Sequence, residues 1–350
     1  MEHWPGVIEH YRPLLSLPPD IEAVTLLEGN TPLVPLPQLA EAMGAGALFA
    51  KCEGLNPTGS FKDRGMTTAV SEALHRGSRA LVCASTGNTA ASAAAYAARA
   101  GLRAFVLVPQ GKVALGKLAG AMAYGAEVIQ VEGSFDSALA MVRAIAEEFP
   151  LAVVNSLNPY RLEGQKTAAF EICDTLGRAP DWLALPVGNA GNMTAYWMGF
   201  RQYAREKGTG LPRLLGVQAA GAAPLVLGHP VDNPETLATA IRIGRPVRGA
   251  EAVLAATESL GRIIAVSDEA ILEAQMQLAG QGVWVEPASA ASLAGLTGEV
   301  GAGRLDLRGK TVVCVCSGHG LKDPAAITDR LPRPRVIPDD LHALRGVINL

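Results

Sequence analysis

Short apolar runs rich in β-forming residues alternate with alanine-rich helical patterns along most of this 350-residue chain. The first series predicts strands at 48–53, 80–83, 103–108, 127–131 and 151–154, and helices at 60–76, 88–100, 112–124 and 135–149. The second series predicts helices at 161–176, 192–206, 268–280 and 288–299, and strands at 182–187, 213–219, 283–285 and 311–316. Such alternation is typical of parallel sheets covered by helices. We therefore expect an α/β protein with two open, twisted, mostly parallel sheets and a ligand site in the cleft between them.

Two stretches depart from this alternation. Between 220 and 262, several prolines and glycines indicate long loops around one or two short helices. After Pro332, the segment PRPRVIPDD indicates an extended tail, with a short helix at the end of the chain.

Composition excludes several classes of protein. Thirty basic and 33 acidic residues leave a net charge of −3, which is too balanced for a nucleic-acid binder. No stretch of about 20 residues is apolar throughout, so no membrane span is expected. The first residues lack the pattern of a secretory signal, and the five scattered cysteines lack the spacing of a metal site. We expect reduced thiols in a cytoplasmic protein.

The segment 56–65, NPTGSFKDRG, places a lysine where a helix is predicted to begin. Asn-Pro and Gly59 are turn residues, and Ser60 is a suitable N-cap for the helix. Lys62 then lies in the first turn, where the positive end of the helix dipole disfavours a cation. Its position is explained if the amine works as a neutral nucleophile or base, as in Schiff-base chemistry. The alternative is an ordinary surface lysine.

The segment 186–192, PVGNAGN, joins a predicted strand to a predicted helix. A glycine-rich turn at such a junction presents backbone N–H groups and a helix N-terminus to an anion, and two asparagines add side-chain donors. The pattern favours a phosphate, although it matches neither the Walker A loop nor the dinucleotide fingerprint. The alternative is a plain tight turn.

Two further loops follow predicted strands. The segment 84–89, ASTGNT, is rich in hydroxyl groups and suits a carboxylate held at a helix start. The segment 317–320, SGHG, places a single hydroxyl, that of Ser317, at a strand end. Each loop also has an ordinary capping interpretation. Together, a lysine, a phosphate loop, a carboxylate loop and a lone hydroxyl indicate a cofactor site.

The chain resembles the fold-type-II, tryptophan-synthase-β-like family of pyridoxal-phosphate enzymes, and within it the threonine synthases. The resemblance runs almost end to end, and it is carried by segments 51–65, 84–98, 111–126, 155–172, 186–192, 240–246, 285–292 and 317–323. NPTGSFKDRG, NPYRLEGQK and SGHGLKD favour a synthase over a dehydratase. The dehydratases usually carry Ser-Gly-Gly-Asn in place of the last of these, and many synthases carry threonine in place of Ser317.

The resemblance implies a role for each matched residue with pyridoxal 5′-phosphate. Lys62 corresponds to the lysine that forms the Schiff base, Asn88 to the amide that binds the 3′-oxygen of the ring, and Ser317 to the partner of the ring nitrogen. The loop that cradles the cofactor phosphate is matched by Gly188, Asn189, Ala190, Gly191 and Asn192. The substrate α-carboxylate is expected to bind at Ser85, Thr86 and Thr89.

The implied reaction converts O-phospho-L-homoserine and water into L-threonine and phosphate. The phosphate of the substrate needs a second anion site, for which Arg161, Asn155 and Ser156 are the candidates, because arginine binds phosphate through two parallel hydrogen bonds. Arg161 has the alternative of pairing with an acidic surface residue. Glu286 and His319 lie in matched motifs but receive no role.

Two other functions are possible for the same fold. A threonine or serine dehydratase needs the same lysine and the same two loops, but no second phosphate site. A ligand-binding protein without activity is disfavoured because Lys62 and Asn88 are both present. The resemblance also implies a homodimer. It implies a large cofactor-binding domain from residues 1–60 and 156–350, and a smaller mobile domain from residues 61–155.

Overall fold

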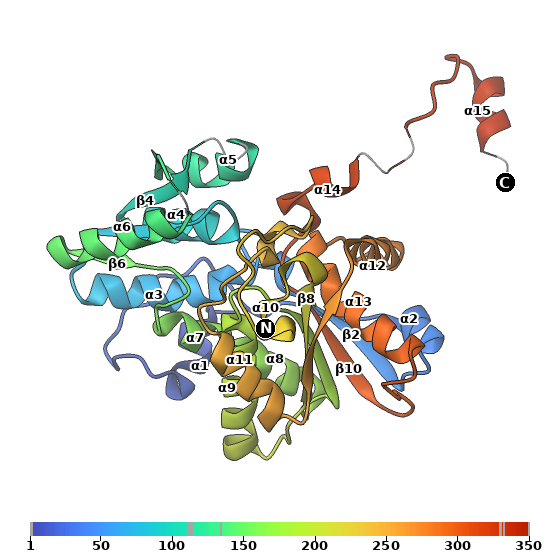
Figure 1. Ribbon diagram of the computed structural model, residues 1–350, viewed down its shortest axis with the longest axis horizontal. Helices are drawn as coiled ribbons and strands as arrows, with labels where there is room; N and C mark the ends of the chain where they lie inside the picture. The colour runs from blue at the N-terminus through green and yellow to red at the C-terminus, as the bar shows by residue number, and fades with distance from the viewer. Residues whose placement is uncertain (1–2, 111–114, 134, 329–330, 332, 349–350) are drawn as a thin grey trace.

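The computed structural model describes residues 3–110, 115–133, 135–328, 331 and 333–348. Its strands form two sheets, each flanked by helices (Figure 1). The larger sheet contains β1 (Leu33–Pro35), β2 (Ala47–Cys52), β10 (Thr311–Cys316), β7 (Trp182–Pro186), β8 (Arg213–Ala219) and β9 (Arg262–Val266), in that order. The smaller contains β5 (Glu127–Val131), β4 (Arg103–Pro109), β3 (Ala80–Ala84) and β6 (Leu151–Val153). In the described chain only the β1–β2 pair is antiparallel, which confirms the predicted fold class.

Helices cover both faces of the larger sheet. One face packs against α2 (Pro37–Ala42), α12 (Asp268–Gly280) and α13 (Pro287–Gly301). The other packs against α1 (Val7–Tyr11), α8 (Thr167–Leu176), α9 (Gly191–Lys207) and α11 (Gly249–Glu258). Within β10, Cys314 and Cys316 belong to the first core and Val313 and Val315 to the second. A strand that is buried on both faces consists of a continuous run of apolar residues, and this pattern predicted β10 from the sequence.

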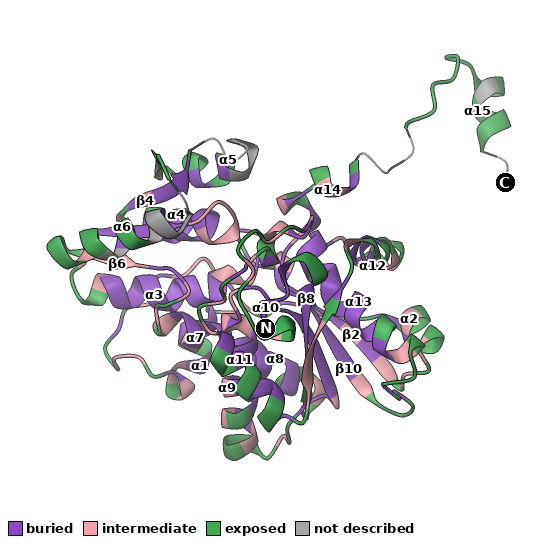
Figure 2. Ribbon diagram, in the orientation of Figure 1, coloured by how far each residue is buried: buried purple, intermediate pink, exposed green. Residues whose placement is uncertain are grey.

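The smaller sheet is covered in the same way. The helices α3 (Lys62–His75), α4 (Asn88–Ala100) and α5 (Leu115–Ala123) contribute to one core, and α6 (Phe135–Glu148) to the other. The remaining helices are α7 (Tyr160–Gln165), α10 (Pro224–Leu227), α14 (Ala325–Thr328) and α15 (Leu341–Val347). The strands are mostly buried, whereas the tail that ends in α15 is exposed (Figure 2). Within the described ranges, no helix is long and apolar enough to cross a membrane.

Several elements differ from the sequence-based expectations. The helix predicted at 161–176 is divided into α7 and α8 at Lys166, whose carbonyl accepts from Ala169 N, three residues on. The strand predicted at 283–285 is reduced to one bridge between Val285 and His319. The short helices expected between 220 and 262 are α10 and α11. The elements α1, α2, β1 and β9 were not predicted, because short or isolated patterns among prolines and glycines resemble loops. The expected helix start at Lys112 lies outside the described residues.

The carboxyl ends of five strands bring the candidate residues together. Each of β2, β3, β6, β7 and β10 is followed, at once or after one to three residues, by one of the polar segments singled out above. Because the strands within each sheet run parallel, these segments gather at one edge of each sheet, which is where open α/β sheets bind their ligands.

Candidate active site

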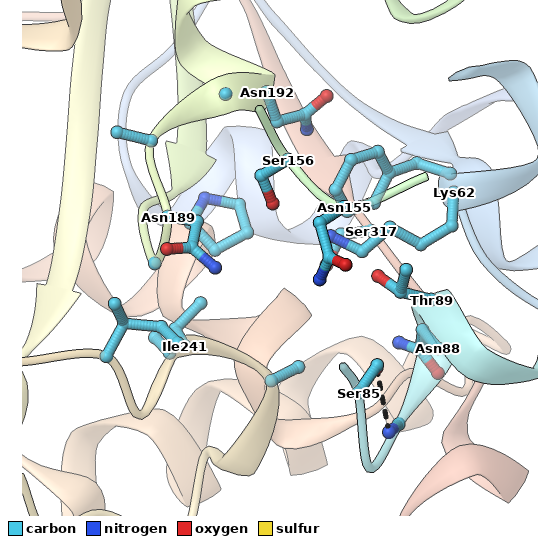
Figure 3. A pocket seen from close by; sticks show the side chains of 18 of the residues that line it. Lys62, Ser85, Asn88, Thr89, Asn155, Ser156, Asn189, Asn192, Ile241 and Ser317 are labelled. Carbon is cyan, nitrogen blue, oxygen red and sulfur yellow. Dashed lines mark hydrogen bonds between the residues drawn. The ribbon is translucent and has the colours of Figure 1, made fainter. Parts of the chain in front are cut away.

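One pocket is lined by every candidate site residue named from the sequence. Figure 3 labels several of them, among them Lys62, Asn88 and Ser317. From the smaller sheet come the hydroxyl loop (residues 85–89), which follows β3, and the segment 155–161, which follows β6. From the larger sheet come the glycine loop (residues 188–192), which follows β7, and Ser317, which follows β10. Lys62 begins α3. The predicted residues therefore form a single site between the two sheets.

Lys62 is a lysine without an acidic partner. Among the described residues no carboxylate lies within ion-pair distance of its Nζ, which stands 4.1 Å from the centroid of the Phe61 ring. Burial, followed by the Arg161 guanidinium, lowers the pKa of Lys62 to about 7, against an opposing effect of Glu286. A substantial fraction of the amine is therefore neutral near pH 7 and able to act as a nucleophile or base.

The start of α3 differs from the prediction in one detail. Ser60 is not the N-cap, because the helix is preceded by Phe61, which makes no side-chain capping bond. Ser60 instead forms a β-bridge with Gly318, and Phe61 N donates to Ser317 O at 2.9 Å. These contacts with the end of β10 fix the entry of the chain into α3, so Lys62 and Ser317 are held in the same pocket.

The glycine loop has the features of an anion site. It leads into α9, a helix of 17 residues whose N-cap residue, Ala190, has a φ of +67°. A Cβ at Gly188 would lie 3.0 Å from Ile241 Cα, so a side chain is hard to accommodate there. The buried Nδ2 of Asn192 has no partner in the described structure. An amide donor left without a partner at a helix N-terminus fits a phosphate.

The hydroxyl loop leads into α4. Ser85 Oγ accepts from Gly87 N at 3.3 Å, which closes a tight turn before the helix begins at Asn88. Thr86 and Thr89 also line the pocket. The arrangement places hydroxyls and helix N–H groups opposite the glycine loop, where they can hold a carboxylate.

The segment after β6 contains two residues that differ in what they offer a ligand. Asn155 accepts from Ala84 N at 3.1 Å and donates to Ala84 O at 2.8 Å, so both ends of its amide are engaged in holding the end of β3. Arg161 is 2% exposed and donates from Nη1 to Val154 O at 3.1 Å, while its Nε has no partner among the described residues. Burial lowers the pKa of Arg161 to about 10. Among the residues that the structure describes, Arg161 is therefore not paired with a surface carboxylate.

A close contact between two helices links Arg161 to Lys62. A Cβ at Gly164 in α7 would lie 1.8 Å from the Arg64 carbonyl oxygen in α3, and one at Gly65 would lie 2.7 Å from the Arg161 carbonyl oxygen. Only glycines allow α3 and α7 to approach this closely. The two cationic residues of the pocket therefore stand on a tightly packed helix pair.

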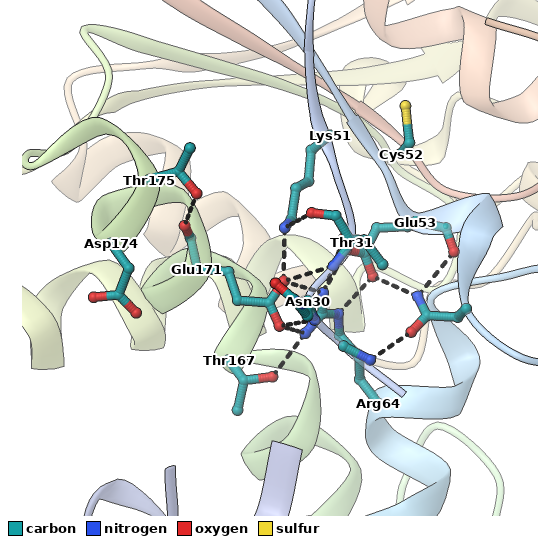
Figure 4. A network of polar contacts seen from close by, with 12 residues as sticks. Asn30, Thr31, Lys51, Cys52, Glu53, Arg64, Thr167, Glu171, Asp174 and Thr175 are labelled. Atoms are coloured by element: carbon teal, nitrogen blue, oxygen red, sulfur yellow. Dashed lines mark hydrogen bonds and ion pairs between the residues drawn. The ribbon is translucent and has the colours of Figure 1, made fainter. Parts of the chain in front are cut away.

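A buried charge cluster (Lys51, Glu53, Arg64 and Glu171) lies behind the start of α3 and was not foreseen from the sequence (Figure 4). Arg64 donates to Glu53 at 2.6 and 2.8 Å and to Glu171 at 2.6 and 2.7 Å. Lys51 donates to Glu171 at 2.6 Å. Although burial acts in the opposite direction, Arg64 and Lys51 lower the pKa of Glu171 to about 2. The only signal in the sequence was an arginine two residues after Lys62.

Comparisons with known proteins identify the family of this chain. Residues 24–318 match the family described as pyridoxal-phosphate dependent enzyme. The threonine synthase of Halalkalibacterium halodurans is 55% identical over 345 residues, which cover 98% of this chain and 97% of that protein. That of Synechocystis sp. is 60% identical over 327 residues, which cover 92% and 84%. The chain belongs to the pyridoxal-phosphate-dependent enzymes, and within them to the threonine synthases.

Solved structures support the fold of this threonine synthase. A maize serine racemase has a TM-score of 0.74 at 21% identity, covering 86% of this chain and 92% of that one. A threonine deaminase from T.th. has a TM-score of 0.67 at 30% identity, covering 83% and 92%. The cofactor fits the residues present, because an unpaired lysine lies in the same pocket as a glycine loop with an unsatisfied amide donor.

Proposed function

We propose that this threonine synthase converts O-phospho-L-homoserine and water into L-threonine and phosphate, with Lys62 as the catalytic residue. Pyridoxal 5′-phosphate, when bound, supplies an aldehyde that condenses with amines and a ring that withdraws electrons from the substrate. Lys62 would hold the cofactor through its Nζ in the resting enzyme. With the substrate bound in its place, Lys62 Nζ would be free to move protons.

The proton transfers all occur within reach of one amine. Lys62 Nζ takes the proton from Cα of the substrate, and a proton also leaves Cβ. The Cγ–O bond breaks, so that phosphate leaves with the bonding electron pair. A proton is added at Cγ, and the oxygen of water bonds to Cβ while one proton of that water passes to the phosphate. A proton then returns to Cα. A lysine whose pKa is about 7 suits this work, because it can accept and return protons near neutral pH.

Each anion has its own set of donors in this proposal. Gly188, Asn189, Ala190, Gly191 and Asn192 hold the cofactor phosphate at the start of α9. Asn88 would hold the ring oxygen of the cofactor, and Ser317 would hold the ring nitrogen through its hydroxyl group. Ser85, Thr86 and Thr89 hold the substrate carboxylate.

The observation that carries the proposal is the unpaired guanidinium of Arg161. A buried cation without a carboxylate partner is costly, and a dianionic phosphate would compensate that cost. We assign Arg161 and Ser156 to the substrate phosphate. Asn155 lines the same place and contributes mainly by fixing the end of β3, since both ends of its amide are engaged. A dehydratase acting on threonine or serine has no phosphate for Arg161 to bind.

We also propose an assembly and a location for the enzyme. Exposed apolar side chains of α10 and α11, including Leu227 and Leu254, are suited to a contact between two copies in a homodimer. All five cysteines are free and buried, in keeping with a cytoplasmic enzyme. The smaller domain (residues 61–155) closes over the substrate held between the hydroxyl loop and Arg161. Light scattering of the purified protein at several concentrations measures the oligomeric state, and a monomer would contradict the homodimer.

One assay tests the reaction directly. The purified holoenzyme is given O-phospho-L-homoserine or L-threonine, and phosphate, threonine and 2-oxobutanoate are measured. We expect equal amounts of threonine and phosphate from the first substrate and little 2-oxobutanoate from the second. Fast formation of 2-oxobutanoate from threonine, without phosphate release from O-phospho-L-homoserine, would identify a dehydratase.

A further inference from the structure

Glu286 is the residue of the pocket to which the reaction above gives no role. It immediately precedes α13 and is 4% exposed. It is the only carboxylate among the described residues that line the pocket. A carboxylate is unexpected here, because the same pocket has to accept a carboxylate and two phosphates. Its presence calls for a specific partner.

That partner is Asn88, which lies 198 residues away in the sequence. Asn88 Nδ2 donates to Glu286 Oε2 at 3.0 Å and to Oε1 at 3.2 Å. Ser317 Oγ lies 3.5 Å from Oε1. Among the described residues no lysine, arginine or histidine nitrogen lies within 4.0 Å of the carboxylate, so Glu286 is not one half of a structural ion pair.

The backbone around Glu286 fixes the direction of the carboxylate. Glu286 N donates to Gly318 O at 3.1 Å, and the side chain makes no capping bond to α13 although it stands at the N-cap position. A Cβ at Gly318 would lie 2.4 Å from Glu286 Oε1, so the carboxylate packs directly on the glycine backbone. Packing on one side and the amide of Asn88 on the other leave the carboxylate little freedom.

Burial raises the pKa of Glu286, and the hydrogen bond from Asn88 and the charges of Lys62 and Lys322 oppose that shift. In its ionised form the carboxylate constrains an amide in one specific way. The amide carries two N–H groups and one oxygen, whereas the carboxylate can only accept. Asn88 must therefore turn Nδ2, and not Oδ1, toward Glu286. If one N–H is shared between the two carboxylate oxygens, the second can donate to another acceptor. An amide without this constraint could rotate by 180° and present its oxygen to that acceptor, which would repel it.

We propose that Glu286 is a positioning residue that acts through Asn88, because it selects the amide orientation that donates to the ring oxygen of the cofactor. This inference rests on the role of Asn88 in the proposed function. Replacement by glutamine keeps the size of the side chain but removes the selection, since a glutamine can donate to Asn88 Oδ1 as well as accept from Nδ2.

The test measures the affinity of the apoprotein for pyridoxal phosphate, by fluorescence titration, in a double-mutant cycle of E286Q and N88A. We expect E286Q alone to weaken binding by about 5- to 10-fold, as for the loss of one hydrogen bond. We expect N88A to weaken binding by at least as much, and E286Q to change it by less than about 2-fold in the N88A background. E299Q is the control, because Glu299 is a buried glutamate of α13 that pairs with Arg262 and Arg304 and does not line the pocket.

The outcomes separate this inference from the function on which it rests. If N88A binds the cofactor as tightly as the parent, the role assigned to Asn88 is wrong. Suppose instead that N88A weakens binding. If E286Q then has no effect, or weakens binding by the same factor in the parent and in the N88A background, only the inference about Glu286 is wrong. Thermal unfolding of each apoprotein shows that the variants are folded. Should E286Q fail to fold, E286D takes its place in the cycle, because it shortens the reach of the carboxylate, and the same non-additivity is expected.

Discussion

Helix α3 joins two regions that differ in whether their buried charged side chains are paired with opposite charges. Arg64, on the side of the charge cluster, makes short hydrogen bonds to two buried carboxylates. Lys62 and Arg161, on the side of the pocket, have no carboxylate within ion-pair distance in the described structure. The charges of the cluster are paired within the protein, whereas those of the pocket have no carboxylate partner among the described residues. If the proposed function holds, the unpaired charges bind ligands and the paired ones stabilise the fold.

The largest expected effect comes from removing the unpaired amine. Lys62→Ala should lower threonine formation by about 10²- to 10⁴-fold or more, because general acid–base catalysis alone is worth that much. Stability should not fall, since no carboxylate loses a partner. The variant should still bind the cofactor weakly through the glycine loop, without a visible absorption band that borohydride abolishes. Near-parental threonine formation would refute the assignment.

The second largest effect is expected on stability, from a substitution in the charge cluster. Arg64→Met leaves Glu53 and Glu171 buried without their main partner, which should lower the free energy of unfolding by about 3–5 kcal/mol. Urea unfolding followed by circular dichroism measures this loss. Arg308→Met is the matched control, because Arg308 pairs with Asp306 at the surface and its removal should leave the midpoint nearly unchanged. Equal midpoints for the two variants would show that the cluster does not stabilise the fold.

Replacement of Arg161 should affect substrate binding more than stability, which is the opposite of what we expect for Arg64. Arg161→Met removes a charge-assisted contact of about 1.5–3 kcal/mol, or roughly 10- to 150-fold in affinity for O-phospho-L-homoserine. Threonine deamination, measured as a side reaction, should change far less, because that substrate has no phosphate. The free energy of unfolding should fall much less than in Arg64→Met. Equal losses on both substrates would place the substrate phosphate elsewhere.

The smallest expected effect concerns the pH at which the amine of Lys62 becomes reactive in the apoprotein. An acylating reagent reacts with neutral amines, and the neutral fraction of a lysine rises as the pH passes upward through its pKa. Labelling of Lys62, followed by mass spectrometry, should therefore rise between pH 6 and 8 and level off, with a midpoint at about 7. Ordinary lysines should keep rising toward pH 10. In Arg161→Met the midpoint should move to higher pH, since a neighbouring cation that lowers the pKa is gone; an unchanged midpoint would show that Arg161 does not influence Lys62.

Local patterns predicted the parallel sheets and the loops that line the pocket, because periodicity and turn residues are visible over ten or fifteen positions. They could not predict pairings between distant segments. Glu286 and Asn88, or Arg64 and Glu171 at a separation of 107 residues, meet only after the sheets have formed. Asn155 illustrates the same limit, since an asparagine after a strand looks available to a ligand until its bonds to Ala84 are known. Ser60 looked like a helix cap because its bridge to Gly318 has no local signature.

The glycine contact between α3 and α7 determines which segments have to be replaced together when the substrate specificity of this enzyme is redesigned. A segment carrying Arg161 could be grafted from a relative, but a side chain at position 164 would meet the Arg64 carbonyl and push α7 away. The grafted guanidinium would then sit farther from Lys62 than in the parent. Both helices therefore have to be replaced together, with glycines kept at 65 and 164. Otherwise the displaced guanidinium would not bind the new substrate.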